Sequence, residues 1–84
     1  MDTRQEADAK MAPLENLFDA AYKLPGVNLQ VWEVNQPYAV DALQEWAREK
    51  GLSVKMTLRD RTPTSPSLDI FMVETEESTI EVFR

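Results

Sequence analysis

The chain has 84 residues, of which 43% are hydrophobic, so it is long enough for one domain with one modest core and too short for two. It contains no cysteine and no histidine, which excludes thiolate nucleophiles, disulfides, zinc sites of the Cys/His kind and an imidazole base. The net charge of -6 has the wrong sign for holding a phosphate backbone or an anionic membrane surface. We therefore expect neither nucleic acid nor a membrane as a partner.

The N-terminal segment is polar. The sequence Thr3-Arg4-Gln5-Glu6 has the spacing of a capping box, which could start a short helix, but only small apolar residues follow it. We expect residues 1–11 to form a polar arm and residues 12–84 to form a single α+β domain. The start is too polar for a signal peptide and no apolar run is long enough to cross a membrane, so a cytoplasmic protein is expected.

A first helix is predicted from Pro13 onward. Apolar residues recur there at the spacing of one helix face, and Leu24-Pro25-Gly26 marks its end. They are Leu14, Leu17, Phe18 and Ala21. Residues 28–34, rich in β-branched and aromatic side chains, then predict a strand.

A second helix follows at once. Asn35 or Gln36 is its expected cap, Pro37 suits its first turn, and Gly51 suits the left-handed residue that ends a helix. Its expected buried stripe comprises Val40, Leu43, Trp46 and Ala47. Strict alternation over residues 52–59 predicts a strand, and the Pro/Ser/Thr-rich segment 60–67 predicts a loop. Residues 68–74 and 79–84 predict two further strands around an acidic hairpin turn.

The predicted order is helix, strand, helix, and then three strands. The simplest packing is a two-layer α+β sandwich, with two helices on one face of a mixed four-stranded sheet.

No catalytic constellation emerges from the residues. Carboxylate pairs such as Glu76-Glu77 and Asp41/Glu45 are expected on solvated surfaces, where nothing raises a carboxyl pKa for acid catalysis. Two glycines are too few for a phosphate-binding loop, and the serines lack a base. We therefore expect no enzyme activity, no cofactor and no metal site.

Two surfaces are candidates for binding. Lys55 and Arg59 share the polar face of one predicted strand, where they are expected to pair with acids on neighbouring strands; a local anion site is the alternative. If Ile70 and Met72 face the helices, Phe71 and Val73 point to the open side of the sheet. An apolar patch there would require a partner.

A homodimer is one way to cover such a patch. It would place Trp32 with Phe71 and Val73 at the contact and Lys55 with Arg59 at the rim. Pairing through a sheet edge is the competing arrangement.

Several short motifs lie in the order found in one known family. They are Ala12-Pro13, Leu24-Pro25-Gly26, the strand 28–34, Asn35-Gln36-Pro37-Tyr38-Ala39, Leu43-Gln44-Glu45-Trp46-Ala47 and Gly51. In this order the chain resembles the TusA/SirA-like family of small sulfur-carrier and regulatory proteins, with which a βαβαββ two-layer fold would be shared. The position of the family's sulfur-carrying cysteine corresponds to Ala12, so the resemblance implies the scaffold without its sulfur chemistry.

Two function classes follow. The first is a protein-binding or regulatory module that docks a protein partner around Met11, Pro13 and Leu14, or on the open sheet face. The alternative is an acidic inhibitor or mimic whose residues 67–84 occupy a basic groove on a host protein.

Overall fold

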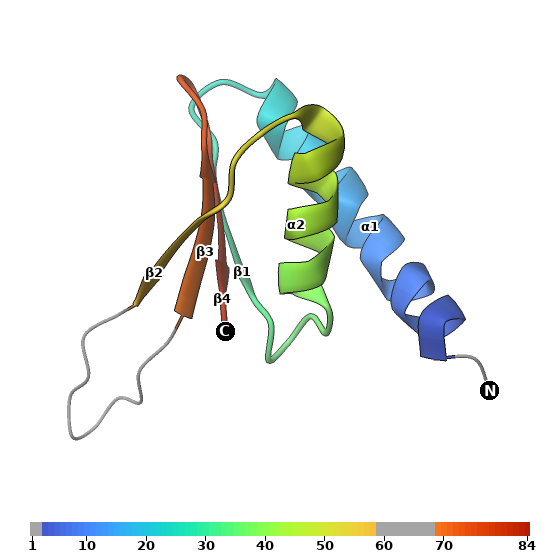
Figure 1. Ribbon diagram of the computed structural model, residues 1–84. Helices are drawn as coiled ribbons and strands as arrows, with labels where there is room; N and C mark the ends of the chain where they lie inside the picture. The colour runs from blue at the N-terminus through green and yellow to red at the C-terminus, as the bar shows by residue number, and fades with distance from the viewer. Residues whose placement is uncertain (1–2, 59–68) are drawn as a thin grey trace.

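The computed structural model describes residues 3–58 and 69–84, and it shows two helices beside a four-stranded sheet (Figure 1). The elements are α1 (Thr3–Lys23), β1 (Asn28–Trp32), α2 (Ala39–Lys50), β2 (Lys55–Leu58), β3 (Asp69–Glu74) and β4 (Thr79–Phe83). This is the predicted order of elements. The expected loop 60–67 lies outside the described residues, as does Arg59.

Helix α1 is twice as long as the sequence pattern indicated. It begins at Thr3, so residues 3–11 form its first half and are not a separate arm. Pro13, taken as a first-turn residue, lies inside the helix. A proline removes one helical hydrogen bond, and the packing of Met11 against the core favours continuation of the helix through this position.

The sheet is mixed, with the strand order β1-β4-β3-β2. β1 runs parallel to β4, whereas β3 is antiparallel to both β4 and β2. Both helices cover the same face, which gives the expected two-layer α+β sandwich (Figure 1). The element order is αβαβββ and not βαβαββ: within residues 3–58 and 69–84, no strand precedes α1 and three follow α2.

The predicted orientation of β3 is wrong. Phe71 and Val73 are 5% and 1% exposed and face the helices, while Ile70 and Met72 point to the open side of the sheet. Apolar side chains occupy both faces of β3, so its own alternation does not distinguish them. β4 alternates clearly, and its register sets Val82 beside Phe71 and Ile80 beside Val73.

The predicted stripe of α2 is confirmed, since Val40, Leu43, Trp46 and Ala47 are all buried. Gly51 ends α2 in the left-handed region at φ 72°, as expected. The expected cap at Asn35 or Gln36 is wrong: Tyr38, at φ 69°, precedes the helix and makes no side-chain capping bond.

Neither of the two helices in the described part of the chain has the length and hydropathy that a membrane span requires.

Candidate functional site

A groove lies between the middle of α1 and strand β1. We call it the α1–β1 groove, and its volume is about 850 Å³. Its walls are Ala9, Lys10, Pro13, Leu14 and Leu17 from α1, Leu29, Gln30, Val31 and Trp32 from β1, and Asn35, Gln36 and Pro37 from the following loop. Figure 1 shows the first turns of α1 leading away from the sheet.

The groove wall on α1 is shaped by residues four positions apart. Ala9, Pro13 and Leu17 succeed one another on one side of the helix, and the first two are small. Pro13 has no N–H, so the carbonyl of Ala9 receives no hydrogen bond from that position. Leu17 remains 44% exposed at this wall. The wall is therefore apolar and shallow, with one backbone acceptor that lacks its usual helical donor.

The opposite wall is the outer edge of β1. The amide of Thr79 donates to the carbonyl of Val27 at 2.9 Å, and the amide of Glu33 donates to the carbonyl of Phe83 at 2.9 Å. Backbone groups of a strand alternate in direction, so the odd-numbered residues 27–33 bond to β4. The N–H and C=O groups of Asn28, Gln30 and Trp32 consequently point away from the sheet.

Strand β1 also ends within the groove. The carbonyl of Trp32 accepts the amides of Asn35 and Gln36, each at 3.0 Å, and these bonds turn the chain away from the edge. The outward groups left for another molecule are both polar groups of Asn28, both of Gln30 and the N–H of Trp32.

The charge of the groove differs from that of the molecule. Lys10 is the single charged residue among the groove's lining residues, although the chain carries a net charge of -6. Its ammonium lies 3.6 Å from Glu6, with both side chains 46% exposed, and 5.8 Å from the centre of the Tyr38 ring. An exposed pair of this kind contributes little free energy, so Lys10 can exchange its partner.

Three residues of the predicted binding set lie together in the groove. Pro13, Leu14 and Trp32 line it, and Met11 lies half-buried against the core. Phe71 and Val73 are core residues on the helix side, so their assignment to a binding surface is wrong. The start of a first helix was the expected docking surface, but Met11, Pro13 and Leu14 lie in the middle of α1.

The open sheet face carries a smaller apolar stripe. Trp32 stacks on Phe83, with ring centres 4.5 Å apart and planes at 20°, and Ile70 pairs with Phe83 in the register. Phe83 is only 7% exposed, so much of this stripe is already covered.

The ion pair expected of Lys55 is not found among the described residues, and the one expected of Arg59 lies outside them. Lys55 lies opposite Met72 and makes no ion pair with the described residues. Asp69 instead pairs with Arg84 at 3.6 Å, and Glu81 accepts a bond from Gln30 at 3.5 Å.

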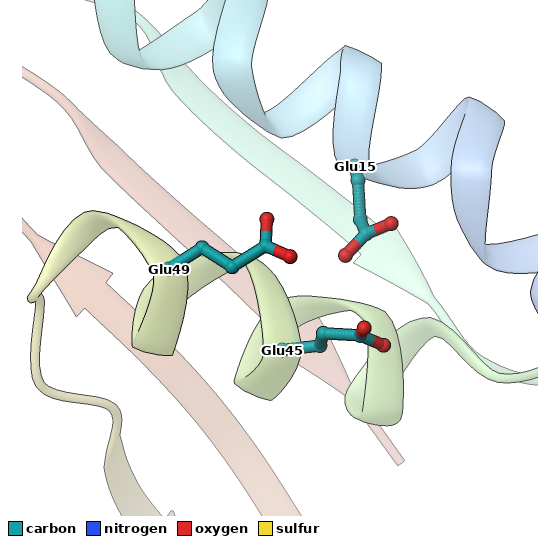
Figure 2. A group of neighbouring side chains, drawn as sticks. All are labelled: Glu15, Glu45 and Glu49. Atoms are coloured by element: carbon teal, nitrogen blue, oxygen red, sulfur yellow. The ribbon is translucent and has the colours of Figure 1, made fainter.

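A cluster of three carboxylates lies between the two helices. Glu15 of α1 points toward Glu45 and Glu49 of α2, and carboxylate oxygens of all three lie within 4.8 Å of one another (Figure 2). Burial, reinforced by the charges of Glu45, Glu49 and Asp8, raises the pKa of Glu15. Carboxylate oxygens are the ligands that hard divalent cations prefer, and these three are the described residues able to supply them together.

Sequence reasoning placed Glu45 on a solvated helix face and missed this cluster. The only local signal is the four-residue spacing of Glu45 and Glu49, because Glu15 reaches them only through helix packing. One turn further along α1, Asp19 binds Lys50 at 2.8 Å and Lys23 at 2.9 Å. Hydrogen bonds from Lys50 and Lys23 lower the pKa of Asp19 to about 2.

Comparison with protein-family models, with curated proteins and with solved structures gives no match for this chain. The similarity to the TusA/SirA-like family therefore stays a prediction.

Proposed function

We propose that this protein is a small acidic protein-binding module without catalytic activity, and that the α1–β1 groove is its binding surface. The observation that carries the proposal is an exposed apolar groove bounded on one side by an unpaired strand edge. Concave apolar sites with a few convergent polar groups are where proteins bind ligands.

The exposed apolar side chains support this location. Leu17, which is 44% exposed, lies on the groove wall, and Trp32, which is 39% exposed, lies at the end of the groove with its ring on the open face of the sheet. Val34 is 84% exposed and shares with Trp32 and Phe83 a second, smaller hollow at the end of β1. Half of the large hydrophobic side chains exposed in the described residues thus gather along the β1 edge, as at interaction sites of other proteins.

The occupant we propose is a segment of another protein and not a second copy of this chain. A second copy paired through β1 would bring no acidic side chain to Lys10, because the strand Asn28–Trp32 carries no charge. Each copy would also carry its net charge of -6 to the contact. A protruding segment fills the groove and meets the one charge on its walls, Lys10.

Sulfur transfer is not part of the proposal. Ala12 has no side chain able to carry sulfur, and no cysteine stands elsewhere in the sequence. Incubation with thiosulfate or a persulfide donor is therefore expected to leave the protein mass unchanged. An added sulfur atom seen by intact-protein mass spectrometry would contradict this expectation.

The test is selection of binders from a random-peptide library displayed on phage, with the purified protein as bait. Selected peptides are expected to lose binding to the Leu17→Glu variant and to retain it with Leu24→Glu. Leu24 is a matched control because it is 57% exposed and does not line the groove. Selected peptides that bind both variants equally, or no selected peptide at all, would overturn the proposal.

A second candidate is the acidic inhibitor or mimic, which the hairpin joining β3 and β4 favours. Glu74, Glu76 and Glu77 are all exposed there, and they line one small hollow. A partner held by these carboxylates would be lost steeply as salt rises, whereas an apolar segment in the groove would not. Binding that is salt-sensitive, insensitive to Leu17→Glu and abolished by Glu76→Lys would favour this candidate.

A further inference from the structure

We infer that the α1–β1 groove receives its ligand as an added β-strand: an extended segment that bonds to the outer edge of β1, directs apolar side chains toward α1 and carries an acidic residue facing Lys10. This inference rests on the proposed function and specifies the class of its ligand. Addition of a strand to an open sheet edge is a recurrent mode of peptide recognition.

The backbone of β1 provides the hydrogen-bonding pattern. The register with β4 leaves the N–H and C=O of Asn28 and Gln30 and the N–H of Trp32 directed outward from the edge of β1; Gln30 and Trp32 line the groove, and Asn28 precedes it on the same edge. Outward residues of a strand repeat about every 6.6 Å, which matches the repeat of any extended partner. Because the carbonyl of Trp32 is held by the amides of Asn35 and Gln36, the added ladder ends there. The ligand therefore bonds over about five residues.

The side chains of β1 set the pattern of the ligand. Leu29 and Val31 face the helix layer, so a strand laid beside them directs every second side chain into the same layer. That space is bordered by Pro13 and Leu17, which favours apolar side chains at these positions of the ligand. The intervening side chains lie on the open face, beside Gln30 and Trp32, where polar residues are accepted.

Charge adds one further requirement. Lys10 is the only charged residue of the groove wall, and its exposed pairing with Glu6 at 3.6 Å is weak enough to be exchanged. An aspartate or glutamate of the ligand is therefore favoured next to Lys10. Acidic residues elsewhere in the ligand are opposed by the net charge of -6.

The opposite edge of the sheet lacks these features. Met56 of β2 points to the helix side, as its pairing with Phe71 shows, but it is 60% exposed and thus has no helix wall beside it. Lys55, on the same strand, is of the type that natural proteins place on edges to prevent pairing. The β1 edge is consequently the one prepared for a partner.

The experiment uses a synthetic peptide selected for Leu17-dependent binding and compares Gln30→Pro with Gln30→Ala. The amide of Gln30 points outward, so proline at this edge position leaves the ladder with β4 intact and removes one donor to the ligand. We expect Gln30→Pro to raise the Kd about tenfold or more and Gln30→Ala to change it less than about twofold. Thermal melts of both variants establish that each is folded.

Methylation of the peptide amides, one at a time, provides the same test without altering the protein. Binding is expected to fall at alternate ligand residues, since only every second amide of an added strand bonds to β1. Lys10→Ala is expected to weaken a peptide that carries an acidic residue and to leave its amide analogue unchanged.

The outcomes separate the two proposals. A peptide that requires Leu17 but shows no alternation on methylation and no loss with Gln30→Pro would overturn strand addition and leave the groove as the binding surface. Peptides that bind the Leu17→Glu variant as tightly as the wild type would overturn both the groove as the binding surface and strand addition. A dimer of the free protein in sedimentation equilibrium that Gln30→Pro dissociates would assign the β1 edge to a second copy and overturn the inference.

Discussion

Replacement of Glu15 by glutamine is expected to stabilise the protein at neutral pH. Glu15 lies half-buried between the helices, and its carboxylate lies within 4.8 Å of those of Glu45 and Glu49 (Figure 2). Two unit charges about 4.8 Å apart repel by about 1 kcal/mol in a water-like dielectric, so the two neighbours oppose ionised Glu15 by about 2 kcal/mol before screening. Screening at physiological salt leaves about 1 kcal/mol for Glu15→Gln to recover.

The raised pKa of Glu15 determines how the effect of Glu15→Gln on stability varies with pH. Burial and the neighbouring acids raise the pKa of Glu15 above its ordinary value of 4.5 in the folded state. The folded state therefore binds this proton more tightly than the unfolded state does. The penalty is absent below the ordinary pKa and complete once the pH exceeds the raised one. The advantage of Glu15→Gln should accordingly appear as the pH rises through this window and vanish in acid.

The assay is urea unfolding of both proteins between pH 3 and 8, supported by thermal melts. About 1 kcal/mol corresponds to a rise of about 4–8 °C in the midpoint for a domain of this size. Glu76→Gln is the matched control, because it removes one negative charge from the exposed hairpin turn. Equal effects of the two substitutions, or a loss of stability with Glu15→Gln at pH 7, would refute the reasoning.

Three further predictions concern the core, the C-terminus and the ion pairs between the helices. In denaturant unfolding, Leu43→Ala should destabilise the protein by about 2–5 kcal/mol, because Leu43 is 0% exposed. Val54→Ala should cost about 1 kcal/mol, because Val54 is only half-buried at the margin of the core. Equal costs would contradict the observed packing. Deletion of residues 80–84 should abolish the thermal transition, since β4 lies between β1 and β3; a truncated chain with an unchanged transition would contradict this. The ionised Asp19 carboxylate stabilises the wild-type protein above the ordinary Asp pKa of 3.8, and this stabilisation is lost as the pH falls toward about 2. Asp19→Asn should remove it, so the acid-unfolding curves of the two proteins should converge at the acid end. Curves that stay parallel there would refute the stabilising role of the Asp19 ion pairs.

The sequence by itself determined the elements of this fold and their order. Alternation in β4 and the apolar stripe of α2 are local patterns, because burial on one side repeats with the period of the element. The end of α2 at Gly51 was equally predictable, since the left-handed conformation at a helix end strongly favours glycine. These signals suffice for a two-layer α+β sandwich.

The sequence did not determine which face of β3 is buried. Ile70 and Met72 are as apolar as Phe71 and Val73, so the buried face of β3 is determined by its register with β4 and by packing against the helices. The extent of α1 was likewise hidden, because the local cost of Pro13 inside a helix is offset by tertiary contacts such as that of Met11 with the core.

The candidate site arises almost entirely from tertiary structure. Pro13 and Leu17 acquire a role only because α1 diverges from the sheet beside an edge strand, and the open groups of Asn28 and Gln30 exist only because β4 pairs with the other side of β1. The Glu15 cluster needs two helices to meet at one level. A local pattern specifies which side chains are buried. A groove or a cluster depends instead on the relative positions of separate elements, and packing across the whole chain determines those positions.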